Sequence, residues 1–151
     1  MQSGGGPDDG GNRWGFFGKV RNDTWHHGLD LYAPIGTQTF ACVDSIVIDD
    51  YTSDTYGKTL TLKGEYNNQT YYFFYSHLSE RVVSKSNNLI KAGTVIGKTG
   101  QTGNASGQLS KMNHLHFEVR NTSNRTGGRL DPYTIIELKS INKNPKKENQ
   151  V

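Results

Sequence analysis

The chain has 151 residues, enough for one ordinary domain and not comfortably enough for two. Hydrophobic residues make up 32% and there are 18 glycines, a composition near that of globular proteins, which excludes wholesale disorder. The formal net charge of +3 does not require a nucleic-acid partner, and no apolar run approaches the ~18 residues of a membrane span. Cys42 is the only cysteine, so an internal disulfide and a cysteine-based zinc site are both excluded.

Two polar segments flank the part of the sequence that we expect to fold. Residues 1–12 are rich in glycine and are expected to be a flexible lead-in, and residues 139–151 form a polar, basic tail. This division assigns residues 13–138 to one domain. The lead-in lacks the apolar stretch of a secretory signal, so we expect a processed product or a domain exported by another route.

Between these ends the pattern is that of short β-strands. Runs rich in β-branched and aromatic residues are separated by clusters of Gly, Asn, Asp and Ser. The predicted strands include Thr39–Ile48, Thr59–Leu62, Thr70–His77, Val95–Ile96 and His114–Arg120. Near the end, Asp131 as a cap and Pro132 at the first helical position predict a helix through YTIIELK. The fold class is therefore a small, mainly β domain with an antiparallel sheet and one short C-terminal helix.

The first histidine segment, WHHGLD, pairs His26 with Asp30. A straight strand would separate their Cα atoms by about 13 Å. Two ligands of one zinc ion lie only about 3–4 Å apart at their donor atoms. A shared metal therefore requires a bend, which costs least at Gly28. The alternative is that no metal is shared and that the segment is a turn with His26 or His27 exposed.

The second segment is an aromatic run that ends at His77. In a regular strand Tyr71, Phe73, Tyr75 and His77 fall on one face, since side chains alternate. The aromatic side chains are expected to line the core and a groove. His77 taken alone is as consistent with a surface position at a strand end as with a site.

The third segment, HLHFEV, contains two more histidines. As a strand it places one set of side chains on one face, His114, His116 and Glu118, and an apolar set on the other, Leu115, Phe117 and Val119. The apolar face accounts for the strand. Two imidazoles about 6.6 Å apart on the opposite face have no structural explanation and favour a metal or catalytic site.

The three segments together meet the requirements of a hydrolytic metal centre. A catalytic zinc takes three protein ligands and keeps one open position, and two histidines and an aspartate supply that count. The remaining histidines are then available for proton transfer and charge stabilisation. Two histidines and a carboxylate also bind non-haem iron, although those oxygenases usually carry the carboxylate two residues after the first histidine, not four.

Over about residues 14–134 the sequence resembles the lysostaphin/LytM-type zinc endopeptidases, which cut peptide bonds in bacterial peptidoglycan. The matching segments are RWGFFGKV, HHGLDLYAPIGTQTFACVDSIV, YSHLS, IKAGTVIGKTGQTGNASG, HLHFEVR and GGRLDPY. The resemblance implies that Zn²⁺ is bound by His26, Asp30 and His116. It also implies that His114 is the general base that activates water. His77 would be the second catalytic histidine, which steadies the developing oxyanion or passes a proton.

The resemblance further implies a sheet that floors a narrow groove between loops, and a substrate drawn from peptidoglycan stem or cross-bridge peptides. It places the protein outside the cytoplasm, either secreted or in the cell envelope or periplasm. We expect a monomer that neither binds nucleic acid nor inserts into a membrane. The alternative is a non-catalytic LytM-like binding or activating module. Such a module should have lost metal ligands, whereas all three are present.

Overall fold

A computed structural model describes residues 2–3, 17–21, 24–107 and 113–135. In chain order its strands are β1 (Gln2–Ser3), β2 (Gly18–Arg21), β3 (Thr24–His26), β4 (Leu29–Tyr32), β5 (Gln38–Phe40), β6 (Ser45–Asp49), β7 (Thr52–Ser53), β8 (Gly57–Tyr66), β9 (Gln69–Arg81), β10 (Val95–Thr99), β11 (His114–Arg120) and β12 (Arg129–Leu130). A 3₁₀ turn, η1 (Gly103–Ala105), lies between β10 and β11, and the helix α1 (Pro132–Ile135) follows β12.

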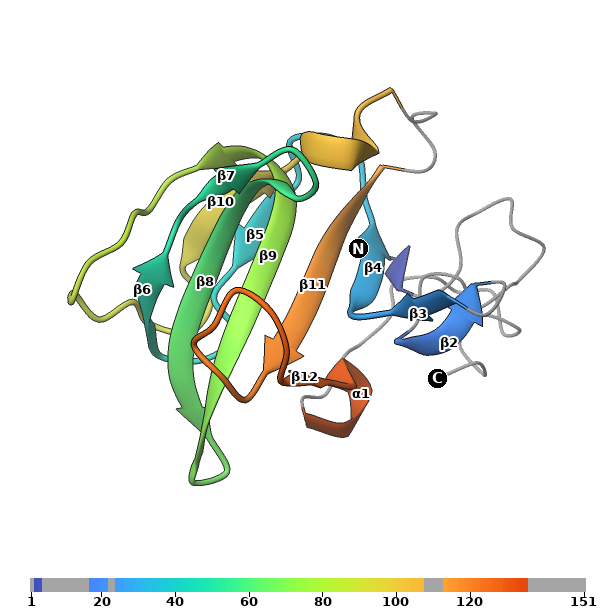
Figure 1. Ribbon diagram of the computed structural model, residues 1–151. Coiled ribbons are helices and arrows are strands. Elements are labelled where there is room, and N and C mark those ends of the chain that lie inside the picture. The colour runs from blue at the N-terminus through green and yellow to red at the C-terminus, as the bar shows by residue number, and fades with distance from the viewer. Residues whose placement is uncertain (1, 4–16, 22–23, 108–112, 136–151) are drawn as a thin grey trace.

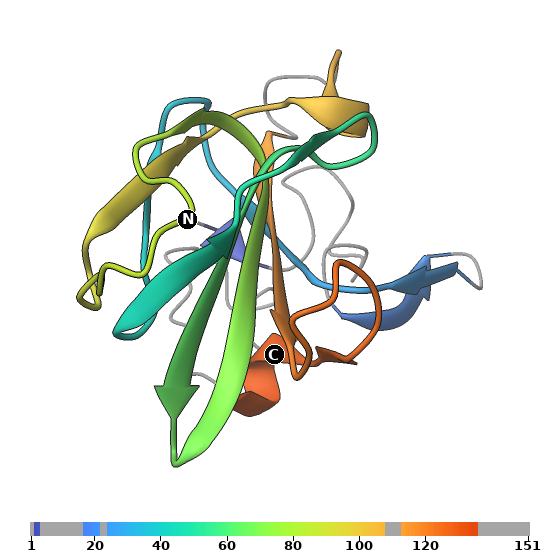
Figure 2. The same cartoon turned by 60° about the vertical axis from the view of Figure 1, so that its left-hand side comes forward.

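Ten of the described strands form one antiparallel sheet, and β2 and β3 form a separate hairpin. The long strand β9 is central because it pairs with β8, β10 and β11. The strand β11 lies between β9 and β4, as Figure 1 shows. In the turned view the β2–β3 hairpin projects away from the sheet (Figure 2). The β4–β11–β9 part of the sheet carries Asp30, His77, His114 and His116, and His26 lies at the end of β3.

The mainly β fold class is confirmed, and β11 has the bounds predicted for it. The single strand predicted over Thr39–Ile48 is wrong, because the structure has two strands there, β5 and β6. The chain bends over residues 42–44. After this bend it leaves the partner of β5, which is β10, and pairs with β8.

The helix begins as predicted. Pro132 is its first residue, and Asp131 Oδ1 accepts a hydrogen bond from the backbone N–H of Tyr133 at 3.1 Å, the expected cap. The rest of the predicted helix lies outside the described residues. So do most of the expected lead-in and the tail over 139–151, while Gln2–Ser3 pairs with β4. The domain limits therefore stay a prediction.

The core lies on one face of the sheet. It contains the predicted aromatic residues of β9 and the apolar face of β11, in a buried cluster of Ala41, Val47, Leu60, Leu62, Tyr71, Phe73, Tyr75, Leu78, Ile96, Leu115, Phe117 and Val119. The opposite face of β11 is buried as well, although its side chains are polar. Among the described residues, no helix has the length and apolar character needed to cross a membrane.

Candidate metal centre

Three of the predicted site residues meet because the chain bends between two strands. His26 ends β3, the chain bends at Gly28, and Asp30 is the second residue of β4. Asp30 is the register partner of His116 in β11. A Cβ atom on Gly28 would lie 2.5 Å from the backbone oxygen of Phe117 and 2.8 Å from His116 Cε1. The bend that a shared metal requires is therefore present, and only glycine allows so close an approach.

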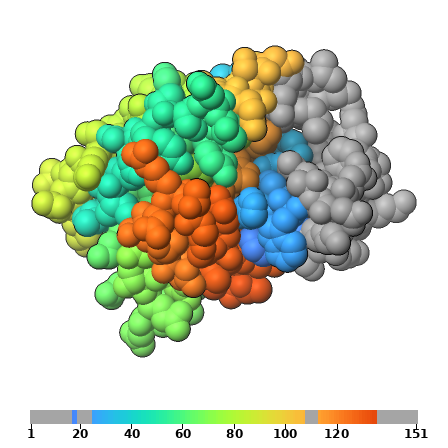
Figure 3. All heavy atoms as spheres, viewed as in Figure 1, coloured from blue at the N-terminus to red at the C-terminus, as the bar shows by residue number. Residues whose placement is uncertain are grey.

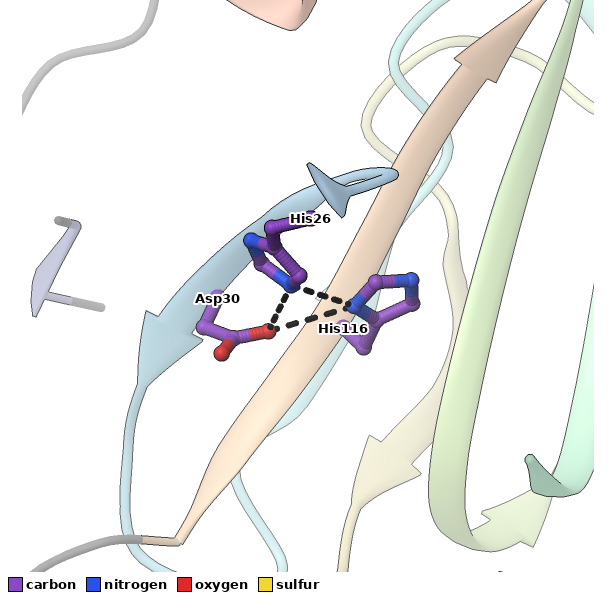
Figure 4. Close-up of side chains that lie close together, drawn as sticks. All are labelled: His26, Asp30 and His116. Carbon is purple, nitrogen blue, oxygen red and sulfur yellow. Dashed lines mark hydrogen bonds and ion pairs between the residues drawn. The ribbon is translucent and has the colours of Figure 1, made fainter. Parts of the chain in front are cut away.

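The donor atoms of these three residues form a triangle. His26 Nε2, Asp30 Oδ1 and His116 Nδ1 each lie 3.2 Å from the other two, as drawn in Figure 4. All three residues are buried. Within the described residues this trio is the group whose ligand atoms lie close enough to share one metal ion.

The triangle fits a tetrahedral metal ion. Bond lengths of about 2.0–2.2 Å and tetrahedral angles place ligand atoms about 3.3–3.5 Å apart, close to the observed separations. Imidazole nitrogen and carboxylate oxygen are donors that zinc accepts. The three side chains would therefore hold such an ion through one atom each, and a fourth position would remain for a reactant.

His114 lies beside this triangle. Its Nε2 is 3.6 Å from Asp30 Oδ1, and its side chain is buried. His114 and His116 lie on the same face of β11, as the alternation of the strand predicts, while Leu115 and Phe117 enter the core. A third imidazole, outside the proposed ligand set, therefore lies next to the two within it.

His77 also reaches the site, but not by the regular alternation that the sequence suggests. Its ring centroid lies 5.4 Å from that of His114 and 6.1 Å from that of His116. The prediction that it shares a face with Tyr75 is wrong. Leu60 pairs with Tyr75 but Lys58 pairs with Leu78, so β9 contains one more residue than β8 at this point. This bulge turns His77 to the side of the site, and Leu78 takes the next core position.

The protonation pattern of His77 follows from one hydrogen bond. Its Nδ1 lies 2.7 Å from the backbone carbonyl oxygen of Thr102, and a carbonyl only accepts, so Nδ1 carries a hydrogen. Burial lowers the pKa of His77 to about 4, with the bond to Thr102 opposing the shift and the charge of His114 adding to it. His77 is therefore neutral near pH 7, with an unprotonated Nε2.

A buried network of charged side chains contacts His116 at Nε2, the nitrogen that does not face Asp30. His116 Nε2 lies 2.8 Å from Glu118 Oε2, and Glu118 Oε1 accepts from Nε of Arg120 at 2.8 Å and from Nε of Arg129 at 3.0 Å. Burial works against the charge of Glu118, but the hydrogen bond and charge of His116, together with Arg120, lower its pKa to about 2. Ionised Glu118 accepts a hydrogen bond from Nε2–H of His116, which makes Nδ1 the nitrogen that could bind a metal.

The protonation states of Asp30 and His116 depend on each other. Burial disfavours ionised Asp30, yet the charge of His114 and hydrogen bonds with His116 and His26 hold the pKa of Asp30 well below its usual range. Burial also opposes protonation of His116, but its bonds to Asp30 and Glu118 raise its pKa to about 9. Without a metal, a proton on His116 compensates the two carboxylates.

A cleft of about 650 Å³ opens beside Thr102. It lies between the β7–β8 turn and the segment that follows β10. The residues that line it include Ile35, Lys58, Gln101 and Thr102. Thr102 therefore both lines the cleft and accepts a hydrogen bond from His77 through its carbonyl oxygen.

The structure therefore brings together the five residues named from the sequence, His26, Asp30, His77, His114 and His116. It adds Glu118 and Thr102, to which the sequence argument gave no role. The position of Glu118 two residues after His116 on the same strand face was a signal that could have revealed it. No comparable signal marks Thr102, whose contact with His77 joins residues 25 positions apart.

The fold and this cluster define a β-sheet domain with a buried group of side chains that could hold a metal ion. The chain belongs to peptidase family M23, which it matches over residues 24–132, a range that contains all of the site residues. This membership agrees with the resemblance noted from the histidine segments.

Similar proteins of known name include the DD-carboxypeptidase/endopeptidase Mpg of Neisseria meningitidis, 32% identical over 99 residues, which are 64% of this chain and 21% of that protein. The peptidoglycan DD-endopeptidase ShyC of Vibrio cholerae is 33% identical over 62% of this chain and 19% of its own length. The catalytic domain of the antimicrobial peptidase lysostaphin from Staphylococcus simulans superposes with a TM-score of 0.65 at 27% identity, covering 88% of this chain and 90% of that one. The aligned part is about a fifth of the length of these two curated relatives.

Proposed function

We propose that this chain is a zinc-dependent endopeptidase that hydrolyses peptide bonds in the stem or cross-bridge peptides of peptidoglycan. The observation that carries this proposal is the triangle of His26 Nε2, Asp30 Oδ1 and His116 Nδ1, whose sides are all 3.2 Å. Relatives named as peptidoglycan endopeptidases support the choice of substrate. Such an enzyme acts in the cell wall, so we place it outside the cytoplasm, secreted or in the envelope or periplasm.

Each site residue has a defined task in this proposal. His26, Asp30 and His116 would hold the ion, which would supply Lewis acidity at the scissile carbonyl and at water. His114 accepts a proton from water as the water oxygen bonds to the carbonyl carbon, and a proton returns to the amine nitrogen when the carbon–nitrogen bond breaks. His77, which faces His114 across the site, is the second catalytic histidine.

Metal retention and cleavage can be tested separately in four variants. We expect His26→Ala and Asp30→Ala to lose bound zinc after dialysis and to lose release of fragments from purified peptidoglycan. We expect His114→Ala to retain one equivalent of zinc but to lose turnover by about 10²–10⁴-fold. His27→Ala is the matched control, because His27 is exposed and adjacent to His26, and it should retain both properties.

Three outcomes would contradict the proposal. A wild-type protein that holds no zinc and is indifferent to chelators would support the non-catalytic module. Loss of zinc in His114→Ala would mean that the roles of His114 and His116 are exchanged. Intact peptidoglycan after incubation with the zinc-loaded protein would exclude this substrate, and mass spectrometry of any fragments would identify the bond that is cut.

A further inference from the structure

The backbone at His77 has an unusual conformation for the middle of a strand. Its φ angle is +58°, in the left-handed region that residues with a side chain seldom occupy. Such a conformation persists only where surrounding contacts enforce it. Part of this enforcement is the hydrogen bond of 2.8 Å from the His77 N–H to the carbonyl oxygen of Tyr56.

Thr102 makes further contacts around His77 through two of its groups. Its carbonyl oxygen accepts from Nδ1 of His77 at 2.7 Å. Its hydroxyl donates to the carbonyl of Leu78 at 2.7 Å and accepts from the backbone N–H of Lys58 at 3.0 Å. Lys58 and Leu78 are register partners where the bulge displaces β9 from β8. The hydroxyl therefore links the two strands beside His77.

Thr102 is also tightly seated. A Cβ atom on Gly57 would lie 2.2 Å from Thr102 Oγ1, and one on Gly103 would lie 2.3 Å from the backbone nitrogen of Gly57. Both glycines have positive φ angles. The segment that carries Thr102 thus rests directly on the backbone of the turn before β8, and the hydroxyl of Thr102 ties it to Lys58 and Leu78 there.

We infer that Thr102 is a positioning residue for His77, whose ring it holds in the tautomer with hydrogen on Nδ1, so that Nε2 faces the site as a proton acceptor. Of the two tasks open to His77, steadying an oxyanion or passing a proton, this arrangement favours the second. Because the Thr102 carbonyl keeps a hydrogen on Nδ1, the neutral ring has none on Nε2 to donate to an oxyanion. Hydrolysis moves both hydrogens of the attacking water: His114 takes the first, and Nε2 of His77 takes the second from the newly bound oxygen and delivers it to the amine nitrogen. The catalytic role of His77 in this inference rests on the proposed function, whereas the tautomer of His77 does not.

The tautomer can be observed directly. Long-range ¹H–¹⁵N correlation spectra of histidine-labelled, zinc-loaded protein distinguish the two neutral forms, and a His77→Asn spectrum assigns the signal. We expect wild-type His77 to carry its hydrogen on Nδ1. In Thr102→Val, which removes the hydroxyl and keeps the shape, we expect a mixture of tautomers and a 10–100-fold slower cleavage of peptidoglycan, with bound zinc unchanged. Thr102→Ser, which keeps the hydroxyl, should restore both properties.

Thr59→Val is the matched control. Thr59 lies next to Lys58, and its hydroxyl also donates to a carbonyl, that of Tyr51 at 2.6 Å, without contact to His77. It should retain the wild-type tautomer and cleave within about threefold of the wild-type rate. The inference is overturned if wild-type His77 carries its hydrogen on Nε2, or if Thr102→Val slows cleavage without changing the tautomer. An inactive wild-type protein with the expected tautomer would contradict the proposed function and leave the positioning role supported.

Discussion

At the scale of single residues, Glu118 shows how much of a metal site lies behind its ligands. It is fully buried, as is Arg120, so its charge is compensated by hydrogen bonds and not by water. Its bond to His116 Nε2 fixes the side of the ring that is free for a metal. Carboxylate partners of this kind orient the ligand and increase its basicity.

We therefore expect Glu118→Gln to bind zinc about 10–100-fold more weakly than the wild-type protein, measured by competition with a chromogenic chelator. The neutral amide no longer compensates Arg120, so the thermal midpoint should fall as well. Glu65→Gln is the control, because Glu65 is exposed on β8 and should leave both values unchanged. Equal zinc affinity in wild type and Glu118→Gln would show that zinc binding by His116 does not depend on the charge of Glu118.

At the scale of elements, the turn between β3 and β4 brings distant ligands together. Gly28 packs against the backbone of Phe117 so closely that an added methyl group must push β4 and β11 apart. We expect Gly28→Ala to lower the free energy of unfolding by about 1–3 kcal/mol, as overpacking does, and to weaken zinc binding because His116 is displaced. Denaturant unfolding and chelator competition measure the two effects.

Gly93→Ala separates this contact from ordinary backbone strain. Gly93 has a φ angle of +83°, but its missing Cβ would meet no atom within 4 Å. In this variant the free energy of unfolding should fall by about 1 kcal/mol, and zinc binding should equal that of the wild-type protein. Weakened zinc binding in Gly93→Ala would mean that general destabilisation, and not the position of Gly28, explains the loss.

The elements also show which features a sequence can predict. Alternation placed His114 and His116 on one face of β11 correctly, because that strand pairs without interruption with β9 and β4. The same rule failed for His77, since a single extra residue in β9 reverses the side on which a side chain lies. The contact with Thr102 was equally hidden, because it depends on how two turns pack and not on any local pattern.

At the scale of the whole molecule, the hydrophobic core and the candidate metal centre lie on different faces of the sheet. The apolar cluster supports one face of β9 and β11, and the site lies on the other. The segment from Asn121 to Gly128 belongs to the orange part of the surface in Figure 3 and contacts the segment around Tyr51. It is held there by Arg125, which pairs with Asp49 at 2.8 Å and stacks on Tyr51 at 4.0 Å from the ring centroid. The sheet therefore does not depend on a metal for its core.

Removing the metal should weaken the domain without unfolding it. In the metal-free protein a proton on His116 compensates Asp30 and Glu118, so the ligand face avoids uncompensated buried charge. We expect chelation to leave the far-ultraviolet circular dichroism spectrum at room temperature unchanged and to lower the thermal midpoint. At a free zinc concentration a thousandfold above the dissociation constant, the ion contributes about 4 kcal/mol, so the midpoint should rise with added zinc. Asp30→Ala should show no such dependence, and loss of the β-sheet spectrum on chelation would prove instead that the metal is required for folding.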